Sequence, residues 1–210
     1  MAQRPRTRID WFLAVTTPAV TVLARTEVPA APFTELAHVS GGRVVVEPVA
    51  APERWRLPAG NSLVGMTMRA LPFARDAGRR FKALDRRAAF DVVEVPEYQG
   101  WGLGVARAAQ VAVVVRLHTH TGLVRRLNDV AIDLDARFCA RLEAATIRRG
   151  DLVLANSRAL ATIATADFEG HLPVGRLDVL PLGVDTDRFA PGDEGWLKAH
   201  LGLPAETPVL

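Results

Sequence analysis

The sequence predicts an α/β domain built on a Rossmann-like, doubly wound and mostly parallel β-sheet. Apolar runs of strand length alternate along the chain with segments of helical periodicity. Several of these runs are almost continuous valine, leucine and alanine, which is typical of strands buried on both faces of a parallel sheet. Polar or small residues follow several runs directly, and ligands bind beyond the carboxyl ends of such strands.

Composition excludes several classes of protein. The 210 residues are 49% hydrophobic and 23% charged, as in an ordinary globular protein. The basic residues are spread along the chain without interleaved aromatics, so we expect no nucleic-acid partner. The single cysteine, Cys139, excludes an internal disulfide and lies in an apolar helical stretch, which favours a buried, inert thiol. Nothing in the sequence is typical of a zinc site, and we expect neither a metal nor a cofactor.

The sequence contains no apolar run of 18 residues, so it predicts no transmembrane helix. The apolar stretch 11–15 is too short to be convincing as a signal peptide. We therefore expect a cytoplasmic location.

The predicted strands are short and separated by helices. They are 11–16, 20–25, 43–48, 92–95, 111–117, 152–155 and 177–182. Predicted helices cover 61–87, 103–109, 132–148 and 158–168. In the first, Asn61 and Ser62 are candidate caps, and Val64, Met68, Leu71, Phe81 and Leu84 form the expected apolar stripe, with a kink expected at Pro72. In the third, Phe138, Leu142 and Ala145 form the expected apolar face, and Gly150 follows its end.

Two junctions do not fit a complete Rossmann-like domain. Only residues 17–19 separate the first two strands, whereas a parallel crossover needs a dozen or more residues. The two segments are therefore a tight turn, one bent strand, or the remainder after loss of a first loop and helix. At the other end, 208–210 resembles the opening of a further strand. We expect a fragment, with a first domain at 1–200 and the start of a truncated second domain at 201–210.

Polar and small residues follow four of the predicted strands. Glu97, Tyr98 and Gly100 follow the strand 92–95, and His118, Thr119 and His120 follow the strand 111–117. Asn156, Ser157 and Arg158 follow the strand 152–155, and residues 183–185 follow the last strand. If the strands are parallel, these groups lie on one edge of the sheet.

Four segments in this order resemble family 4 of the glycosyltransferases, whose members have the GT-B fold. They are FDVVEVPEY at 90–98, VRLHT at 115–119, the stretch from 142 to DLVLANS at 151–157, and VLPLGVDTDRFAP at 179–191. The resemblance covers about residues 90 to 210. It implies transfer of a sugar from a nucleotide-sugar donor to a sugar or lipid-linked acceptor, with retention at the anomeric carbon. It also implies that the chain is the N-terminal, acceptor-side half of two Rossmann-like domains, and that the C-terminal domain is missing.

His118 is the strongest catalytic candidate. It follows a buried strand, and the histidine at this position in the family lies beside the reacting sugar. Its imidazole would hydrogen-bond a sugar hydroxyl or share developing positive charge. The alternative is a histidine that binds a strand-end carbonyl. His120 is expected to be accessory or structural.

The other candidates are expected to contact substrate. Glu97 would bind acceptor hydroxyls and Tyr98 would stack on a sugar, against the alternative of a solvated loop. Ser157 is first of all a helix cap, and the N–H groups from Arg158 onward are open to an anion. The full set of expected binding residues is Glu97, Tyr98, Gly100, Arg116, Thr119, His120, Asn156, Ser157 and Arg158.

The predicted helix 61–87 is rich in cations. Arg69, Arg75, Arg79, Arg80, Lys82, Arg86 and Arg87 lie along it. A solvated face is the first interpretation, and peripheral docking on anionic lipid at the inner face of the membrane is the second.

The chain also departs from the family. Family members carry a glycine-rich loop near the donor phosphates, and residues 16–19 contain no glycine. We therefore expect this chain alone to be inactive. The alternatives are a non-catalytic or degenerate sugar- or nucleotide-binding module of the same fold, and a Rossmann-like oxidoreductase, which lacks its glycine fingerprint here.

Overall fold

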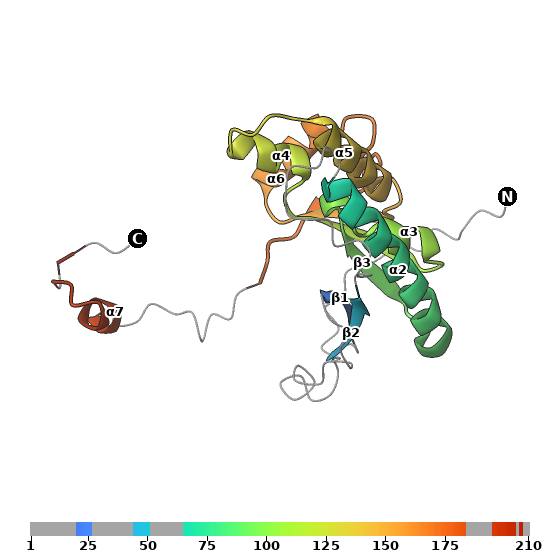
Figure 1. The fold of residues 1–210 in the computed structure, drawn as a ribbon, viewed down its shortest axis with the longest axis horizontal. Helices are drawn as coiled ribbons and strands as arrows, with labels where there is room; N and C mark the ends of the chain where they lie inside the picture. Colours follow the sequence, from blue (N-terminus) through green and yellow to red (C-terminus); the bar gives the residue numbers. More distant parts are fainter. Residues whose placement is uncertain (1–19, 27–43, 51–64, 184–194, 205, 208–210) are drawn as a thin grey trace. The chain divides into compact units, whose positions relative to one another are not determined.

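The computed structural model describes residues 20–26, 44–50, 65–183, 195–204 and 206–207 (Figure 1). Internal contacts divide the chain into two units, Met1–Leu180 and Pro181–Leu210. The described part of the second unit contains one helix, α7 (Gly195–His200), which buries none of its residues. The expected domain boundary at residue 200 stays a prediction.

The first unit contains the predicted parallel sheet. Its strands are β3 (Val92–Pro96), β4 (Ala112–Leu117), β5 (Leu152–Ala155) and β6 (Leu177–Val179), and they lie side by side in chain order. All three ladders are parallel. Val115 pairs with Val95 on one side and with Val153 on the other, and both Val115 and Val153 are fully buried. The α/β fold class predicted from the apolar runs is confirmed.

Two further strands pair with each other. β1 (Val20–Thr26) and β2 (Val44–Ala50) form a parallel two-stranded sheet. Among the described strands, no ladder joins this pair to β3–β6, so the sequence prediction of one continuous sheet holds for four strands only. Val49 nevertheless belongs to the same core cluster as Val95 and Phe81. The predicted strand 11–16 and the junction at 17–19 lie outside the described residues.

Helices flank the four-stranded sheet (Figure 1). They are α2 (Gly65–Ala88), α3 (Leu103–Ala108), α4 (Thr121–Leu127), α5 (Leu134–Ile147) and α6 (Arg158–Asp167), with a short 3-10 turn, η2 (Tyr98–Gly100). The sequence predicted four of these helices and missed α4. No helix in the described part of the chain is both long enough and apolar enough to cross a membrane.

The buried face of α2 differs from the predicted stripe. Leu71 is 43% exposed, whereas Phe73 and Phe81 are buried together with a row of alanines and Gly78. A Cβ on Gly104 of α3 would lie 1.6 Å from the carbonyl oxygen of Ala74, so the two helix backbones touch. Phe81 is buried as predicted. The prediction missed Phe73, the alanines and Gly78, and the small residues are buried because α3 packs so closely against this helix.

The predicted face of α5 is wrong at Phe138, whereas Leu142 and Ala145 are half-buried. Phe138 is 44% exposed, and the buried side of the helix instead carries Asp135, Cys139, Glu143 and Ile147. The thiol of Cys139 is buried as predicted, and desolvation raises its pKa to about 11. Two carboxylates thus lie on the side of α5 that faces the protein.

Asp135 connects α5 to the beginning of α2. Its Oδ2 accepts from the N–H of Met66 at 2.7 Å, and its Oδ1 accepts from the N–H of Thr67 at 2.9 Å. These N–H groups belong to the first turn of α2, where a helix has no internal acceptor for them. The expected caps Asn61 and Ser62 lie outside the described residues.

Candidate functional site

The polar segments after β3, β4 and β5 meet at one edge of the sheet. Pro96 pairs with Arg116, and Leu117 pairs with Ala155, so the three strands end at the same level. The next residues along the chain, Glu97, His118 and Asn156, therefore begin neighbouring loops at the carboxyl edge. The sequence predicted this convergence from the order of the strands.

Glu97 connects the first two loops. Its carboxylate is fully buried and accepts the backbone N–H of His118 with both oxygens, Oε1 at 2.8 Å and Oε2 at 3.0 Å. Desolvation raises the pKa of Glu97 to about 7, and the nearby carboxylate of Glu143 adds to the rise. The alternative of a solvated loop is wrong for this residue. In this structure Glu97 positions the backbone of His118 and has no surface open to an acceptor.

The side chain of His118 is exposed at the edge of the sheet. Because Glu97 holds its backbone N–H, the start of the loop is fixed while the imidazole remains accessible. An accessible imidazole there is able to donate or accept a hydrogen bond with a bound ligand. The position therefore suits the role expected for His118.

Glu143 organises the other end of the same loop. Its Oε1 accepts from the backbone N–H of Thr121 at 2.9 Å, from the Thr121 hydroxyl at 2.6 Å and from the backbone N–H of Gln99 at 2.9 Å. Its Oε2 is buried with no hydrogen-bond partner. One carboxylate from α5 thus links η2, after β3, to the first residue of α4.

His120 is buried between the two ends of this loop. Its Nε2 lies 2.6 Å from Oδ2 of Asp167, and its ring packs edge-on against Phe168 with centroids 4.8 Å apart. Arg126 also donates to Asp167. Burial alone would raise the pKa of Asp167, but the hydrogen bonds from Arg126 and His120 outweigh it and lower that pKa. His120 is 4% exposed, which agrees with a structural role.

Arg116 ties three strands together beneath the edge. Its Nε and Nη2 each donate to a different carboxylate oxygen of Glu94, both at 2.8 Å, and its Nη1 donates to Oδ1 of Asn156 at 3.4 Å. The hydrogen bonds that Arg116 donates to Glu94 raise the already high pKa of this guanidinium. Arg116 and Asn156, both expected to contact substrate, are thus partners of each other.

A family comparison covers most of this region. The family model described as Glycosyltransferase Family 4 matches residues 19–188. The chain belongs to glycosyltransferase family 4. The resemblance seen in the four sequence segments is therefore confirmed.

A solved structure shows the same fold. Sucrose-phosphate synthase from Thermosynechococcus elongatus matches with a TM-score of 0.64 at 17% sequence identity. The match covers 93% of this chain and 45% of the synthase, so the family 4 chain spans about half the length of that protein. No curated protein sequence matches the chain significantly.

The remaining predicted residues lie around the same edge of the family 4 fold. The Oγ of Ser157 accepts from the N–H of Leu160 at 3.1 Å, which confirms the predicted cap, and Arg158 is exposed at the start of α6. Thr119 is half-buried beside His118. Residues 184 and 185 lie outside the described part of the chain.

Tyr98 and Gly100 lie in η2. The ring of Tyr98 packs edge-on against Trp101, with centroids 5.6 Å apart, and its hydroxyl accepts from Nε2 of Gln99 at 3.1 Å. Gly100 is buried with φ of 72°, and a Cβ there would lie 2.4 Å from the Cβ of Leu142. Glycine is therefore required at position 100 for packing against α5.

Sequence reasoning missed Glu143 and Asp167 as organisers of the loop. A signal for Glu143 was present, because it occurs at helical spacing from Ala136, Cys139 and Ile147, all of them buried. A carboxylate in such a buried stripe indicates a hydrogen-bond acceptor. Among the described residues, no group of three or more histidine, cysteine, aspartate or glutamate side chains is placed to hold a metal ion.

Proposed function

We propose that this family 4 chain is the acceptor-side half of a retaining glycosyltransferase, which moves a sugar from a nucleotide-sugar donor to an acceptor. The observation that carries the proposal is the arrangement of His118: an exposed imidazole at the carboxyl edge of the sheet, on a backbone held by buried Glu97. A group that must contact a reacting sugar needs this combination of access and fixed position.

His118 acts on the sugar in this proposal. As the glycosidic bond to the nucleotide breaks, positive charge develops at the anomeric carbon and its ring oxygen. A hydrogen bond from the imidazole to a sugar hydroxyl, or the electron-rich ring itself, stabilises that state more than the ground state. Glu97 and Glu143 act through the backbone as positioning residues, because they fix both ends of the segment that carries His118.

The donor is held mainly by a second Rossmann-like domain in this proposal. A fold match that spans 45% of the synthase is what one of two such domains would give. The chain by itself then lacks the groups that grip the nucleotide, and we expect it to be inactive alone. The proposal includes no metal ion and no cofactor.

The acceptor is a sugar or a lipid-linked sugar, and the reaction takes place in the cytoplasm. Peripheral contact with an anionic membrane belongs to the same proposal, because the exposed side of α2 carries Arg75, Arg79 and Lys82. The alternative function is a non-catalytic or degenerate sugar-binding module, which would use the same edge of the sheet without turnover.

The coding sequence downstream of Leu210 and an activity assay test the proposal together. An in-frame α/β domain with two glutamates at a helix start supports the transferase, and an immediate natural stop supports the binding module. The full gene product and the 210-residue chain are each incubated with uridine, guanosine and adenosine diphosphate sugars, and release of the nucleoside diphosphate is measured. We expect release by the full product only. Sugar binding without release by the full product would favour the alternative, and release by the chain alone would contradict the expected inactivity.

A further inference from the structure

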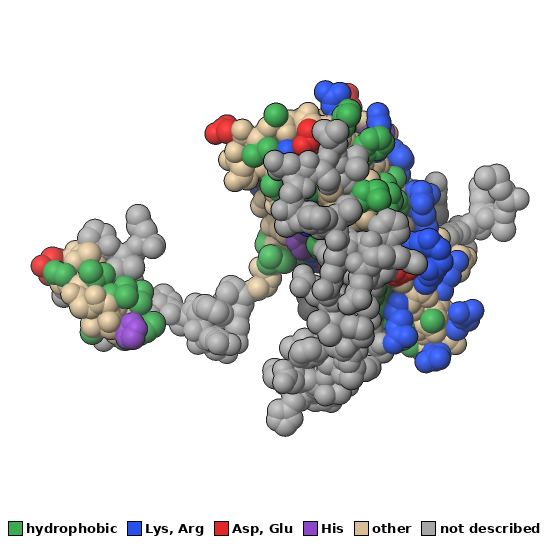
Figure 2. Space-filling view, viewed as in Figure 1, with side chains coloured by type: hydrophobic (Ala, Val, Ile, Leu, Met, Phe, Trp, Pro, Cys, Tyr) green, Lys and Arg blue, Asp and Glu red, His purple; other side chains and the backbone are tan. Residues whose placement is uncertain are grey.

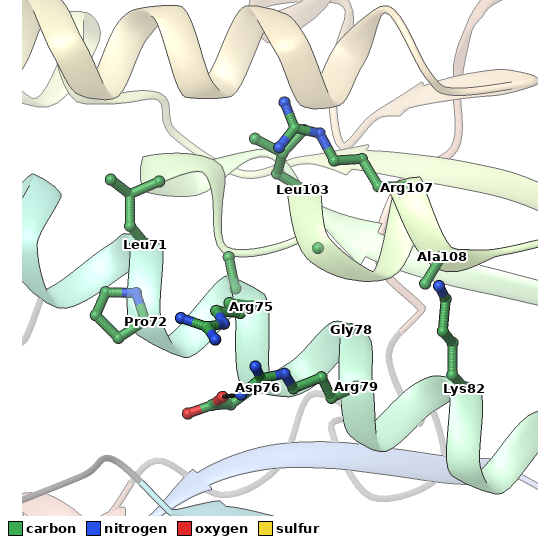
Figure 3. A pocket seen from close by; sticks show the side chains of 12 residues that line it. Leu71, Pro72, Arg75, Asp76, Gly78, Arg79, Lys82, Leu103, Arg107 and Ala108 are labelled. Atoms are coloured by element: carbon green, nitrogen blue, oxygen red, sulfur yellow. Dashed lines mark hydrogen bonds and ion pairs between the residues drawn. The ribbon is translucent and has the colours of Figure 1, made fainter.

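A groove lies between α2 and α3. Its volume is about 540 Å³, which falls in the range of small-molecule sites. Leu71, Pro72 and Leu103 contribute apolar lining, and Figure 3 shows these residues together with the charged side chains around them. The groove is open at the surface of the protein.

Four cationic side chains line the groove. Arg75, Arg79 and Lys82 come from successive turns of α2, and Arg107 comes from α3 (Figure 3). Asp76 is the one carboxylate in the lining, and it forms an exposed ion pair with Arg79 at 3.2 Å. Within the described parts of the chain, no carboxylate lies at ion-pair distance from the other three cations.

The positive charge extends beyond the lining. The pKa of Arg149 is lowered, first by desolvation and then by the charges of Arg107 and Arg148. Figure 2 shows lysine and arginine side chains gathered along the side of the molecule where α2 lies. An excess of positive charge around a concave, partly apolar surface attracts anions.

The cationic end of the groove lies toward the edge of the sheet opposite the candidate site. In a right-handed parallel α/β unit the helices run antiparallel to the strands. Lys82 near the end of α2 and Arg107 near the end of α3 therefore lie toward the amino edge, whereas His118 follows the carboxyl end of β4. The groove thus runs from the start of α3, close to the carboxyl edge, to Lys82 and Arg107 toward the amino edge.

We propose that the α2–α3 groove is a binding site for a phosphorylated ligand. Arg75, Lys82 and Arg107 hold its phosphate groups, and the apolar lining contacts the rest of the molecule. Cations that serve only to keep a helix in contact with water are expected on the outer face of a single helix. Here cations from two helices line one concavity, and their combined charge favours an anion bound inside it. The phosphate belongs either to a soluble phosphoester or to a lipid headgroup, and the second case rests on the membrane contact proposed above for α2.

The test compares wild type with a variant of the groove and a matched control. The groove variant carries Arg75→Gln, Lys82→Gln and Arg107→Gln. The control carries Arg86→Gln, Arg87→Gln and Arg137→Gln, which removes the same number of exposed positive charges outside the groove lining. Circular dichroism checks folding, and the single variant Arg107→Gln replaces the triple variant if the triple does not fold.

Binding is measured with two probes at low ionic strength, about 50 mM. Calorimetry with inorganic pyrophosphate tests a soluble phosphoester, and sedimentation with vesicles of phosphatidylglycerol and phosphatidylcholine, against phosphatidylcholine alone, tests a headgroup. We expect the groove variant to bind at least one probe about tenfold more weakly, while the control binds as wild type does. Weaker binding of pyrophosphate by the groove variant identifies a soluble phosphoester as the source. Weaker binding of anionic vesicles alone identifies a lipid headgroup. No binding of either probe by wild type, or equal loss in the control, would overturn the proposal.

Discussion

The carboxylate of Glu97 receives the backbone N–H of His118 on both of its oxygens, at 2.8 and 3.0 Å, and has no exposed surface. The backbone of the exposed histidine is thus fixed by a buried acid from the neighbouring strand end. Because the pKa of this acid is raised to about 7, its protonation changes within the physiological range. The stability of the site is therefore coupled to pH.

Glu97 is expected to make the protein less stable as the pH rises. Its pKa goes from an ordinary value of 4.5 to about 7 on folding, so between these values the folded state binds more protons than the unfolded state. The free energy of unfolding then falls as the pH rises through this window, by on the order of 3 kcal/mol at most. Urea unfolding at about pH 5 and about pH 8 measures this, and Glu97→Gln should remove most of the difference. An unchanged difference in Glu97→Gln would show that another group is responsible.

Glu143→Ala is expected to destabilise the protein by about 3–5 kcal/mol, because it leaves two backbone N–H groups and the Thr121 hydroxyl without an acceptor and opens a cavity. Glu143→Gln keeps an oxygen at this position and should cost about 1 kcal/mol or less. Urea unfolding of both variants measures the difference, with the exposed Glu169→Ala as a control. Equal stability of Glu143→Ala and the control would contradict this account of the loop.

Gly104→Ala is expected to separate α2 from α3. The added Cβ would lie 1.6 Å from the carbonyl oxygen of Ala74, and a backbone atom cannot move aside without shifting its helix. We expect a loss of about 1–3 kcal/mol in the free energy of unfolding, the usual cost of overpacking. Gly183→Ala is the control, since a Cβ there meets nothing within 4 Å. A neutral Gly104→Ala would mean that the two helices are not in contact.

Asp135→Ala is expected to loosen the first turn of α2. The N–H groups of Met66 and Thr67 lose their acceptors, and loss of such a cap costs about 0.5–2 kcal/mol. Hydrogen exchange of these two amides, followed by NMR, should become faster. In the control Ser157→Ala, which removes the cap of α6 through Leu160, their exchange should stay as in wild type. The same acceleration in both variants would indicate general unfolding instead.

Much of the fold and part of the site were predictable from the sequence. Runs such as 111–117 consist of residues that suit a strand covered on both faces, and their order places His118 beside Glu97 at one edge. The cap at Ser157 was predictable because its effect is local. Neither prediction required knowledge of how helices pack.

The errors came from packing between segments far apart in the chain. The burial of Glu97 and Glu143 depends on backbone donors more than 20 residues away, which no local pattern reveals. Leu71 and Phe138 were assigned to the core because they are large and apolar, yet both are exposed, while the alanines of α2 and the carboxylates of α5 are buried. Where two backbones touch, as at Gly104, small side chains decide the packing.

The most direct test of the proposed function is the turnover number of the full gene product with His118 replaced. His118→Ala should lower kcat by about 10²–10³-fold, as loss of a group that stabilises transition-state charge does. His171→Ala is the matched control, because His171 is also an exposed histidine and contacts Arg148 instead of the sheet edge. We predict a loss confined to His118→Ala with folding unchanged. Equal kcat values for the two variants would contradict the assignment of this sheet edge to sugar transfer.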